Sequence, residues 1–374
     1  MHTRGPALTA GQLRREINLR AEDYARAHHL LHDLSPGPSP SVIFGRDALG
    51  LHGNFHHASY NRILAHPDWA RRLAKPHTAS RRSVARKDWR WMELDSATSS
   101  DALLMNIFCH PDVFEEQLNA PIAALLGVDR TAQPRFGANP GVPLATPLKP
   151  RRKKAAPLDA FDRTEIDLVL SGPTTTLFLE AKLTESDFQT ATPTLLARYR
   201  DLDLVFDTDW LPRTPVATLT MATRATHSSR SDESRSDAWF SAAARMPSAA
   251  RSDDWIEQHS SYQSAEVPTA PDIPADFLES APPAEPRIAG YQLIRNVLAA
   301  HAAGAAFCLL LDARRRDLID TWYAVLSAVR SPSLATRLRV LTWQDLTPAL
   351  PPDLRQFLAT KYGIQPLTQG RQYT

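Results

Sequence analysis

The stretch TEIDLVLSGPTTTLFLEAK, residues 164–182, decides how this chain of 374 residues folds. Side chains of a strand alternate between two faces. In the first expected strand, Asp167 therefore lies on the face opposite the more apolar one. In the second, Glu180 and Lys182 share one face. The Ser-Gly-Pro sequence at 171–173 favours a turn between the runs. The stretch therefore predicts an antiparallel hairpin whose register brings Asp167 close to Glu180.

Two carboxylates and one ammonium would then converge. A hard cation such as Mg²⁺ takes oxygen ligands, commonly one or two carboxylates completed by water and substrate phosphate. Asp167 and Glu180 are suited to hold it, while Lys182 would orient an attacking water or stabilise the transition state. The pattern leaves open whether one ion or two would bind. Lysine is rare here, because only seven of the 43 basic residues are lysine, and a compact point charge differs from an arginine fork.

A plainer interpretation is also open. Glu180 and Lys182 would then lie on the solvated face of an ordinary amphipathic hairpin, where such pairs contribute little to stability. Against this, an acidic residue, a turn and then Glu-x-Lys at the end of an apolar run is a more demanding pattern than three matching letters.

The stretch resembles the PD-(D/E)XK nuclease superfamily, with its restriction-endonuclease-like fold. Ile166 stands where the proline of that name would be. The runs SSDALLMNIFCHP (99–111), KLTESDF (182–188) and YQLIRN (291–296) are similar to a bacterial restriction-endonuclease-like subgroup. The resemblance implies an α/β fold with an αβββαβ core and a mixed central sheet flanked by helices. It also implies Asp167, Glu180 and Lys182 as catalytic residues, and Mg²⁺, or Mn²⁺ in its place, held by Asp167, Glu180 and the backbone carbonyl of Ala181.

The segment before the hairpin predicts the first core helix. Residues 101–126 have near-helical apolar spacing, interrupted by Pro111 and Pro121. Ser99 or Ser100 would cap this helix, and Glu115 and Glu116 offer either an additional site carboxylate or a solvated face. Residues 134–147 predict an edge strand or an irregular loop equally well.

The segment after the hairpin completes an α/β pattern. Residues 288–301 predict the second core helix, with Gln292 and Arg295 on its polar stripe. We expect these two, together with Glu165, to support the site or contact phosphate, although a plain surface face suits the helix pair equally. Residues 305–312 and 338–343 predict further strands.

Composition divides the chain into four parts. We expect a basic, mainly helical or irregular N-terminal extension (1–98), the first part of the nuclease core (99–210), a Pro/Ser-rich insertion (211–286) and the second part of the core (287–374). The insertion contains nine prolines and scattered aromatic residues, which suit either a target-contacting arm or a passive wrap.

Net charge is only +2 and the isoelectric point is near 8.6, so global charge alone does not predict nucleic-acid binding. Two local basic clusters are better candidates for phosphate contacts, although solvated faces explain them too. The first cluster, within residues 69–91, contains Arg71, Arg72, Lys75, Arg81, Arg82, Arg86, Lys87 and Arg90, and the second, residues 149–154, includes Arg151 and Arg152. The residues we expect to contact DNA are Arg81, Arg82, Arg86, Lys87, Arg151 and Arg152.

Other motifs are less informative. The spacing of His52, His56, His57 and His66 fits no standard zinc site, so we expect surface or packed histidines. Cys109 and Cys308 lie in apolar runs and are expected to be buried thiols. The sequence shows no signal peptide, membrane span or nucleotide-binding fingerprint, which favours the cytoplasm and a site without nucleotide.

The sequence therefore predicts a Mg²⁺-dependent endonuclease acting on DNA in a restriction or defence system. The alternatives are a catalytically inactive DNA-binding or assembly protein that retains the fold, and an RNA-processing nuclease. A homodimer would suit a cut through both strands of DNA.

Overall fold

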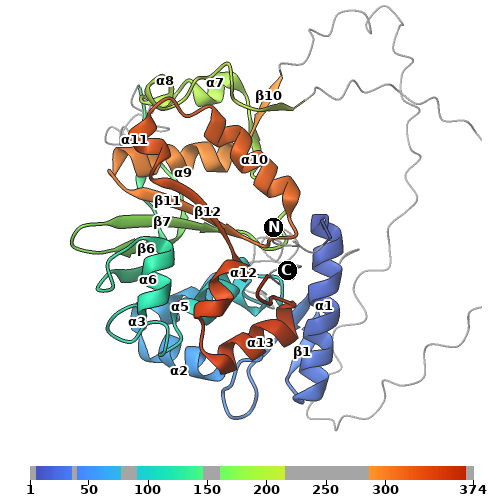
Figure 1. The fold of residues 1–374 in the computed structure, drawn as a ribbon. Coiled ribbons are helices and arrows are strands. Elements are labelled where there is room, and N and C mark those ends of the chain that lie inside the picture. Colours follow the sequence, from blue (N-terminus) through green and yellow to red (C-terminus); the bar gives the residue numbers. More distant parts are fainter. Residues whose placement is uncertain (1–5, 36–39, 77–90, 146–160, 215–285, 368–374) are drawn as a thin grey trace, which may run out of the picture. The chain divides into compact units, whose positions relative to one another are not determined.

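A mixed sheet of five strands forms the centre of the described part of the chain (Figure 1). The computed structural model describes residues 6–35, 40–76, 91–145, 161–214 and 286–367. In spatial order the strands are β12 (Leu338–Thr342), β11 (Ala306–Leu311), β7 (Thr176–Ala181), β6 (Ile166–Ser171) and β3 (Gln133–Ala138). The expected α/β class with a mixed central sheet flanked by helices is confirmed.

The predicted hairpin is present and antiparallel. β6 pairs with β7 so that Leu168 lies opposite Leu179, and the same register continued by one residue places Asp167 opposite Glu180. β3 runs antiparallel to β6, whereas β11 runs parallel to both β7 and β12. The strand that the sequence left ambiguous is thus β3, at the edge of the sheet, where its proline removes no central hydrogen bond.

Helices cover both faces of the sheet (Figure 1). On one face, α5 (Ser100–Phe108) and α6 (Ala120–Leu126) share an apolar core with the side chains of β6 and β7, and α13 (Pro352–Tyr362) contributes to the same core. On the other face, α9 (Tyr291–Ala302) and α10 (Arg316–Ser327) pack against the second set of strand side chains. Both strand faces are therefore buried, which explains why the hairpin carries so few polar residues.

The first core helix is two helices rather than one interrupted helix. α5 begins after Ser99, whose side chain accepts a hydrogen bond from the Ala102 N–H, and ends at Phe108, before Pro111. α6 begins only at Ala120, with Asn119 as its cap and a proline in its first turn. Glu115 and Glu116 lie in the loop between the helices and are exposed, so neither is on a core helix.

The second core helix begins close to the predicted position. Gly290 precedes α9 with φ of +77°, and a Cβ there would meet the Val325 Cγ2 atom at 2.8 Å. Glycine avoids both the left-handed strain and this contact. The order α5, β3, β6, β7, α9, β11 along the chain is compatible with a restriction-endonuclease-like core.

The remaining elements surround this core. The N-terminal region contributes α1 (Ala10–Ala27), β1 (His32–Leu34), β2 (Val42–Phe44), α2 (His57–Ala65), α3 (Pro67–Ala70) and the 3-10 helices η1 (Arg71–Ala74) and η3 (Glu93–Asp95). Short elements follow: β4 (Gly141–Pro143), β5 (Phe161–Arg163), β8 (Thr190–Ala191), α7 (Pro193–Leu196), α8 (Leu202–Val205), β9 (Arg213–Thr214), β10 (Arg287–Ala289), α11 (Pro332–Ala335), α12 (Trp343–Leu346) and η5 (Thr347–Ala349). Among the described residues, no helix combines the length and the apolar character needed to cross a membrane.

Candidate functional site

The hairpin ends in a group of charged side chains. The Lys182 Nζ atom lies 2.9 Å from the Glu180 Oε1 atom, and the Ala181 N–H donates a hydrogen bond of 2.8 Å to the Asp167 Oδ2 atom. Asp167 is partly exposed, whereas Glu180 and Lys182 are only 1% and 7% exposed. The structure thus brings together the three residues that the sequence predicts as catalytic.

Helix α9 supplies two amide donors to Glu180. The Gln292 Nε2 atom lies 2.5 Å from Glu180 Oε1, and the Asn296 Nδ2 atom lies 2.9 Å from Glu180 Oε2. The Thr164 hydroxyl donates to the Asn296 Oδ1 atom at 2.7 Å, which leaves the amide nitrogen of Asn296 facing the carboxylate. Positions 292 and 296 are one helical turn apart, so both side chains leave the same face of α9.

In this group, two carboxylates, Asp167 and Glu180, share a single cationic side chain, Lys182. Burial, then the charges of Glu180 and Asp101, raise the pKa of Asp167 well above its ordinary value. Burial also raises the pKa of Glu180, although Lys182 opposes that shift. For Lys182, burial alone would lower the pKa, but Glu180, Glu185 and Asp167 outweigh it and raise the pKa, so the ammonium stays charged.

The segment that carries Lys182 is held on both sides. Its backbone N–H donates to the Leu310 carbonyl of β11 at 2.8 Å, and its carbonyl accepts from the Trp343 indole N–H at 3.0 Å. The fully buried Arg315 donates to the Glu185 carbonyl at 2.8 Å and pairs with Asp317. Two later segments of the chain therefore fix the lysine backbone, and Arg315 fixes the turn that follows it.

A second charged cluster adjoins the hairpin, formed by Arg72, Lys75, Glu93, Asp101 and Glu165. The Arg72 guanidinium reaches Asp101 Oδ2 at 2.5 Å and Glu165 Oε1 at 2.8 Å. The Lys75 ammonium lies 2.8 Å from Glu165, 3.2 Å from Glu93 and 3.5 Å from Asp101. We call this group the Arg72 cluster; in it two cations face three carboxylates.

A comparison with known protein families identifies the family of this chain. A family model described as restriction endonuclease associating with ARP matches residues 18–363, nearly the whole chain. The chain belongs to this family. Membership indicates a nuclease of restriction or defence type. No curated protein and no solved structure matches significantly.

The three residues predicted to support the catalytic site have different surroundings in the structure. Gln292 contacts Glu180 directly. Arg295 instead donates to the Arg163 carbonyl at 2.6 Å and lies 3.2 Å from Asp162 Oδ2. Glu165 points into the Arg72 cluster rather than toward Glu180. The six basic residues predicted to contact DNA, at 81, 82, 86, 87, 151 and 152, all lie outside the described residues.

The sequence did not predict the roles of three side chains in or beside the hairpin site. Asn296 lies one helical turn after Gln292, and that spacing was the available signal. Asp101 lies in the first turn of α5 behind the Ser99 cap, where a buried carboxylate is unusual. Arg72 comes from η1 of the N-terminal region, about ninety positions before the hairpin. The sequence placed it in a basic cluster suited to phosphate contacts, whereas the structure pairs it with Asp101 and Glu165.

The donor set at the hairpin fits a divalent cation. Asp167 and Glu180 lie opposite each other on adjacent strands, and the charge of Glu180 helps to raise the pKa of Asp167. A bound cation would relieve this repulsion. Asp167 is also partly exposed, which gives an ion access from solvent. These two carboxylates are therefore the side chains that would hold Mg²⁺ or Mn²⁺.

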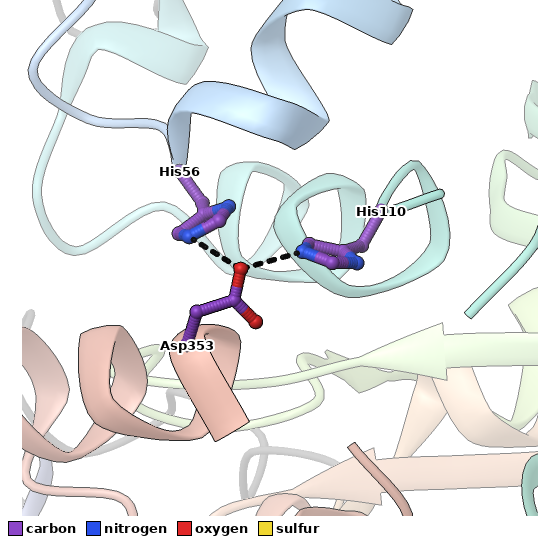
Figure 2. Close-up of side chains that lie close together, drawn as sticks. All are labelled: His56, His110 and Asp353. Carbon is purple, nitrogen blue, oxygen red and sulfur yellow. Dashed lines mark ion pairs between the residues drawn. The ribbon is translucent and has the colours of Figure 1, made fainter. Parts of the chain in front are cut away.

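A third group contains side chains that often bind transition metals (Figure 2). The Asp353 Oδ2 atom lies 3.6 Å from His56 Nε2 and 3.5 Å from His110 Nε2. The Asp112 N–H, however, donates to His110 Nδ1 at 3.2 Å, so the ring proton of neutral His110 is on Nε2. An N–H rather than a lone pair then faces Asp353. We therefore interpret this group as a polar contact that links the residue before α2, the turn after α5 and helix α13.

Proposed function

We propose that this protein is a metal-dependent endonuclease that hydrolyses DNA phosphodiester bonds, with Asp167, Glu180 and Lys182 as its catalytic residues. The observation that carries the proposal is the convergence of two carboxylates with raised pKa values and one charged lysine at adjacent strand ends. Strongly perturbed carboxylates with a specific cationic partner are typical of functional sites. Membership of a restriction endonuclease family supports the same substrate and reaction.

The proposed cation is Mg²⁺, held by Asp167, Glu180 and the backbone carbonyl of Ala181. When bound, it would lower the pKa of a coordinated water and neutralise charge that develops on the phosphate. In its absence the two carboxylates repel each other, so ion affinity and carboxylate ionisation are linked. A site in which a single carboxylate lay beside Lys182 would already be neutral and would attract a cation weakly.

Lys182 acts through its charge. Because its pKa is raised, the ammonium has no lone pair at neutral pH and cannot serve as a general base. It can donate hydrogen bonds to the attacking water or to a phosphate oxygen, and it lies close enough to Glu180 to share that carboxylate. Its proposed role is therefore to orient the nucleophile and to stabilise the transition state.

Gln292 and Asn296 act as positioning residues for Glu180. One amide donates to each carboxylate oxygen, so rotation of the carboxylate breaks at least one hydrogen bond. The Oε1 atom also lies 2.9 Å from Lys182 Nζ, so Oε2, which accepts from Asn296, is the oxygen whose second lone pair is available for a cation. Such fixed outer contacts commonly orient metal ligands and raise metal affinity.

The partner proposals rest on the family description. It names an association with ARP, so we propose a protein partner in addition to DNA. A homodimer of the chain would place two hairpin sites on one duplex and permit a cut through both strands. We propose that the reaction takes place in the cytoplasm without a nucleotide cofactor.

Cleavage of supercoiled and linear DNA by the purified full-length protein tests the proposal, in Mg²⁺, Mn²⁺, Ca²⁺ or EDTA. Asp167→Asn, Glu180→Gln and Lys182→Met should each abolish metal-dependent cutting. Glu116→Gln is the matched control, because Glu116 is an exposed carboxylate outside the site, and it should cut like the wild type. Nicked against linear product separates single-strand from double-strand cuts.

Two results would contradict the proposal. If the wild type binds DNA but never cuts it, with ARP present or absent, the protein is a binding or assembly module. If structured or single-stranded RNA is cut in preference to DNA with the same dependence on the three residues, the site is a nuclease site but the substrate is RNA.

A further inference from the structure

We infer that Arg72 and Lys75 occupy the place of a second divalent cation, so that this nuclease site binds one metal ion per chain. The inference rests on the proposed function and specifies how many ions that site uses. It concerns the Arg72 cluster, which comes mainly from the N-terminal region, and not the hairpin alone.

The first step is the number of carboxylates in this part of the molecule. Glu165 lies two residues before Asp167, and Asp101 is close enough to raise the pKa values of both Asp167 and Glu180. Together with Glu180 they make four carboxylates, a number sufficient for two divalent ions. In two-metal sites the ions lie about 3.5–4 Å apart and share a carboxylate, and Asp167 would be the shared one.

The second step is that cationic side chains already fill the second place. Asp101 Oδ2 accepts from Arg72 Nη2 at 2.5 Å and lies 3.5 Å from Lys75 Nζ. Glu165 Oε1 accepts from both cations at 2.8 Å. One oxygen of each carboxylate, Asp101 Oδ2 and Glu165 Oε1, is therefore shared between a guanidinium and an ammonium.

The third step is that these contacts are built into the fold rather than formed by mobile surface chains. Asp101 is 5% exposed and the Arg72 side chain only 13% exposed. Burial alone would lower the pKa of Arg72, but the charges of Asp101, Glu165 and Asp167 raise it. Arg72 also approaches the backbone of β3, because a Cβ at Gly137 would lie 2.0 Å from its Nη1 atom. Glycine at 137, with φ of +62°, makes the room that the guanidinium needs.

The fourth step is charge balance. The Arg72 cluster contains three carboxylates and two cations, which leaves one negative charge. A divalent ion added there would have to displace a hydrogen-bonded guanidinium or ammonium. The hairpin group also carries one net negative charge, but there Lys182 contacts Glu180 and Asp167 accepts a backbone N–H, so one divalent ion can reach Asp167 without removing a cation. The geometry favours one ion at the hairpin and none in the Arg72 cluster.

Manganese binding measures the number of ions directly. The EPR signal of free Mn²⁺ gives the amount bound to metal-free, full-length protein without any need for DNA or activity. We expect one tightly bound Mn²⁺ for the wild type and none for Asp167→Asn. The double variant Arg72→Met/Lys75→Met should bind two, because Asp101 and Glu165 then lack their cations.

A triple variant separates a new metal site from general loosening of the fold. Adding Asp101→Asn to the double variant removes a carboxylate of the new site, so binding should return to one ion. If the double variant does not fold, Lys75→Gln alone serves, since its side chain is more exposed; it should show a second ion at higher Mn²⁺ concentration.

The outcomes also separate this inference from the proposed function. Two ions in the wild type, or one ion in every Arg72 and Lys75 variant, would overturn the inference while leaving a metal-dependent nuclease intact. No ion in the wild type, together with no cleavage, would overturn both. For the wild type, we expect plasmid cleavage to depend on Mn²⁺ with a Hill coefficient near one.

Discussion

Glu165 and Asp167 are two carboxylates at the start of the same strand, yet their surroundings are opposite. Glu165 accepts hydrogen bonds from Arg72 and Lys75, and these outweigh its burial and lower its pKa. Asp167 accepts a backbone N–H from Ala181 and faces Glu180, and burial together with the charge of Glu180 raises its pKa. The contrast shows that the fold neutralises one carboxylate and leaves its neighbour with unbalanced charge, the state that suits a metal ligand.

The largest expected effect comes from removing the unbalanced charge. Asp167→Asn should reduce DNA cleavage roughly 1,000-fold or more, since an amide is a poor ligand for Mg²⁺. The same change should raise the free energy of unfolding in EDTA at pH 7 by up to about 1 kcal/mol, because two like charges no longer lie opposite each other. Plasmid cleavage and urea unfolding measure the two effects.

The stability gain is the more discriminating half of that prediction. A raised folded-state pKa means that ionised Asp167 destabilises the fold, so the gain should vanish as the pH falls and the wild-type carboxyl becomes protonated. A variant that lost both activity and stability at pH 7 would show that Asp167 has a structural role like that of Glu165, and the contrast would fail.

The next largest effect is expected in the Arg72 cluster, on stability. Arg72→Met leaves the buried Asp101 without its closest cation, and breaking a buried pair in this way costs about 3 kcal/mol. Urea unfolding in EDTA measures the loss. The double variant Arg72→Met/Asp101→Asn removes both charges and should recover more than half of it. Equal losses in the single and double variants would mean that packing of the arginine stem, and not its charge, is what matters.

An intermediate effect is expected from the amides that orient Glu180. Asn296→Ala removes the donor to Glu180 Oε2 and should lower cleavage roughly 10- to 100-fold, in the range found for outer contacts of metal ligands. Thr164→Val should act in the same direction, because the Thr164 hydroxyl fixes the amide of Asn296. The measurement is the initial rate at several Mg²⁺ concentrations.

Non-additivity is the control for this relay. If Thr164 acts only through Asn296, the double variant should be no slower than Asn296→Ala alone. Losses that multiply would show that Thr164 and Asn296 support the site independently. A loss that high Mg²⁺ restores would place the effect on metal affinity, whereas a loss that persists at saturating Mg²⁺ would place it on the chemical step.

The sequence predicted the surroundings of Asp167 well. Strand alternation and a short turn were enough to place Asp167 opposite Glu180, because cross-strand pairing over a tight turn is a local property. Gln292 was also identified, since helical periodicity defines a polar stripe on α9. The apolar run at residues 305–312 predicted strand β11, whereas the mixed sheet was expected from the family resemblance.

The surroundings of Glu165 could not be predicted by the same reasoning. Arg72 and Asp101 meet Glu165 only after segments far apart in sequence pack together, and no periodicity encodes such a contact. Glu165 was therefore expected to support the catalytic group, while the structure shows it bound to two cations. Likewise, the prolines at 111 and 121 indicated an interruption of the first helix, but not that α6 would be a separate helix.

The smallest expected effect concerns the neutralised carboxylate. Glu165→Gln removes a charge that Arg72 and Lys75 stabilise, so the variant should be less stable than the wild type at pH 7, by less than about 1 kcal/mol because the side chain is 39% exposed. The ordinary pKa of glutamate is about 4.3, and the folded-state pKa is lower. Ionised Glu165 therefore stabilises the fold above about pH 4.3, and this contribution is lost as the pH falls through the folded-state value.

The difference between wild type and Glu165→Gln should thus be present at pH 7 and close at about pH 3, measured by urea unfolding at both values. Asp167→Asn should show a difference of the opposite sign at pH 7 that also closes on acidification. Other carboxylates titrate in the same range, but they are common to all three proteins and cancel in each difference. If both variants changed the free energy of unfolding in the same direction at pH 7, the two carboxylates would have equivalent surroundings. The raised pKa of Asp167 would then no longer distinguish a metal ligand from a carboxylate in a structural ion pair.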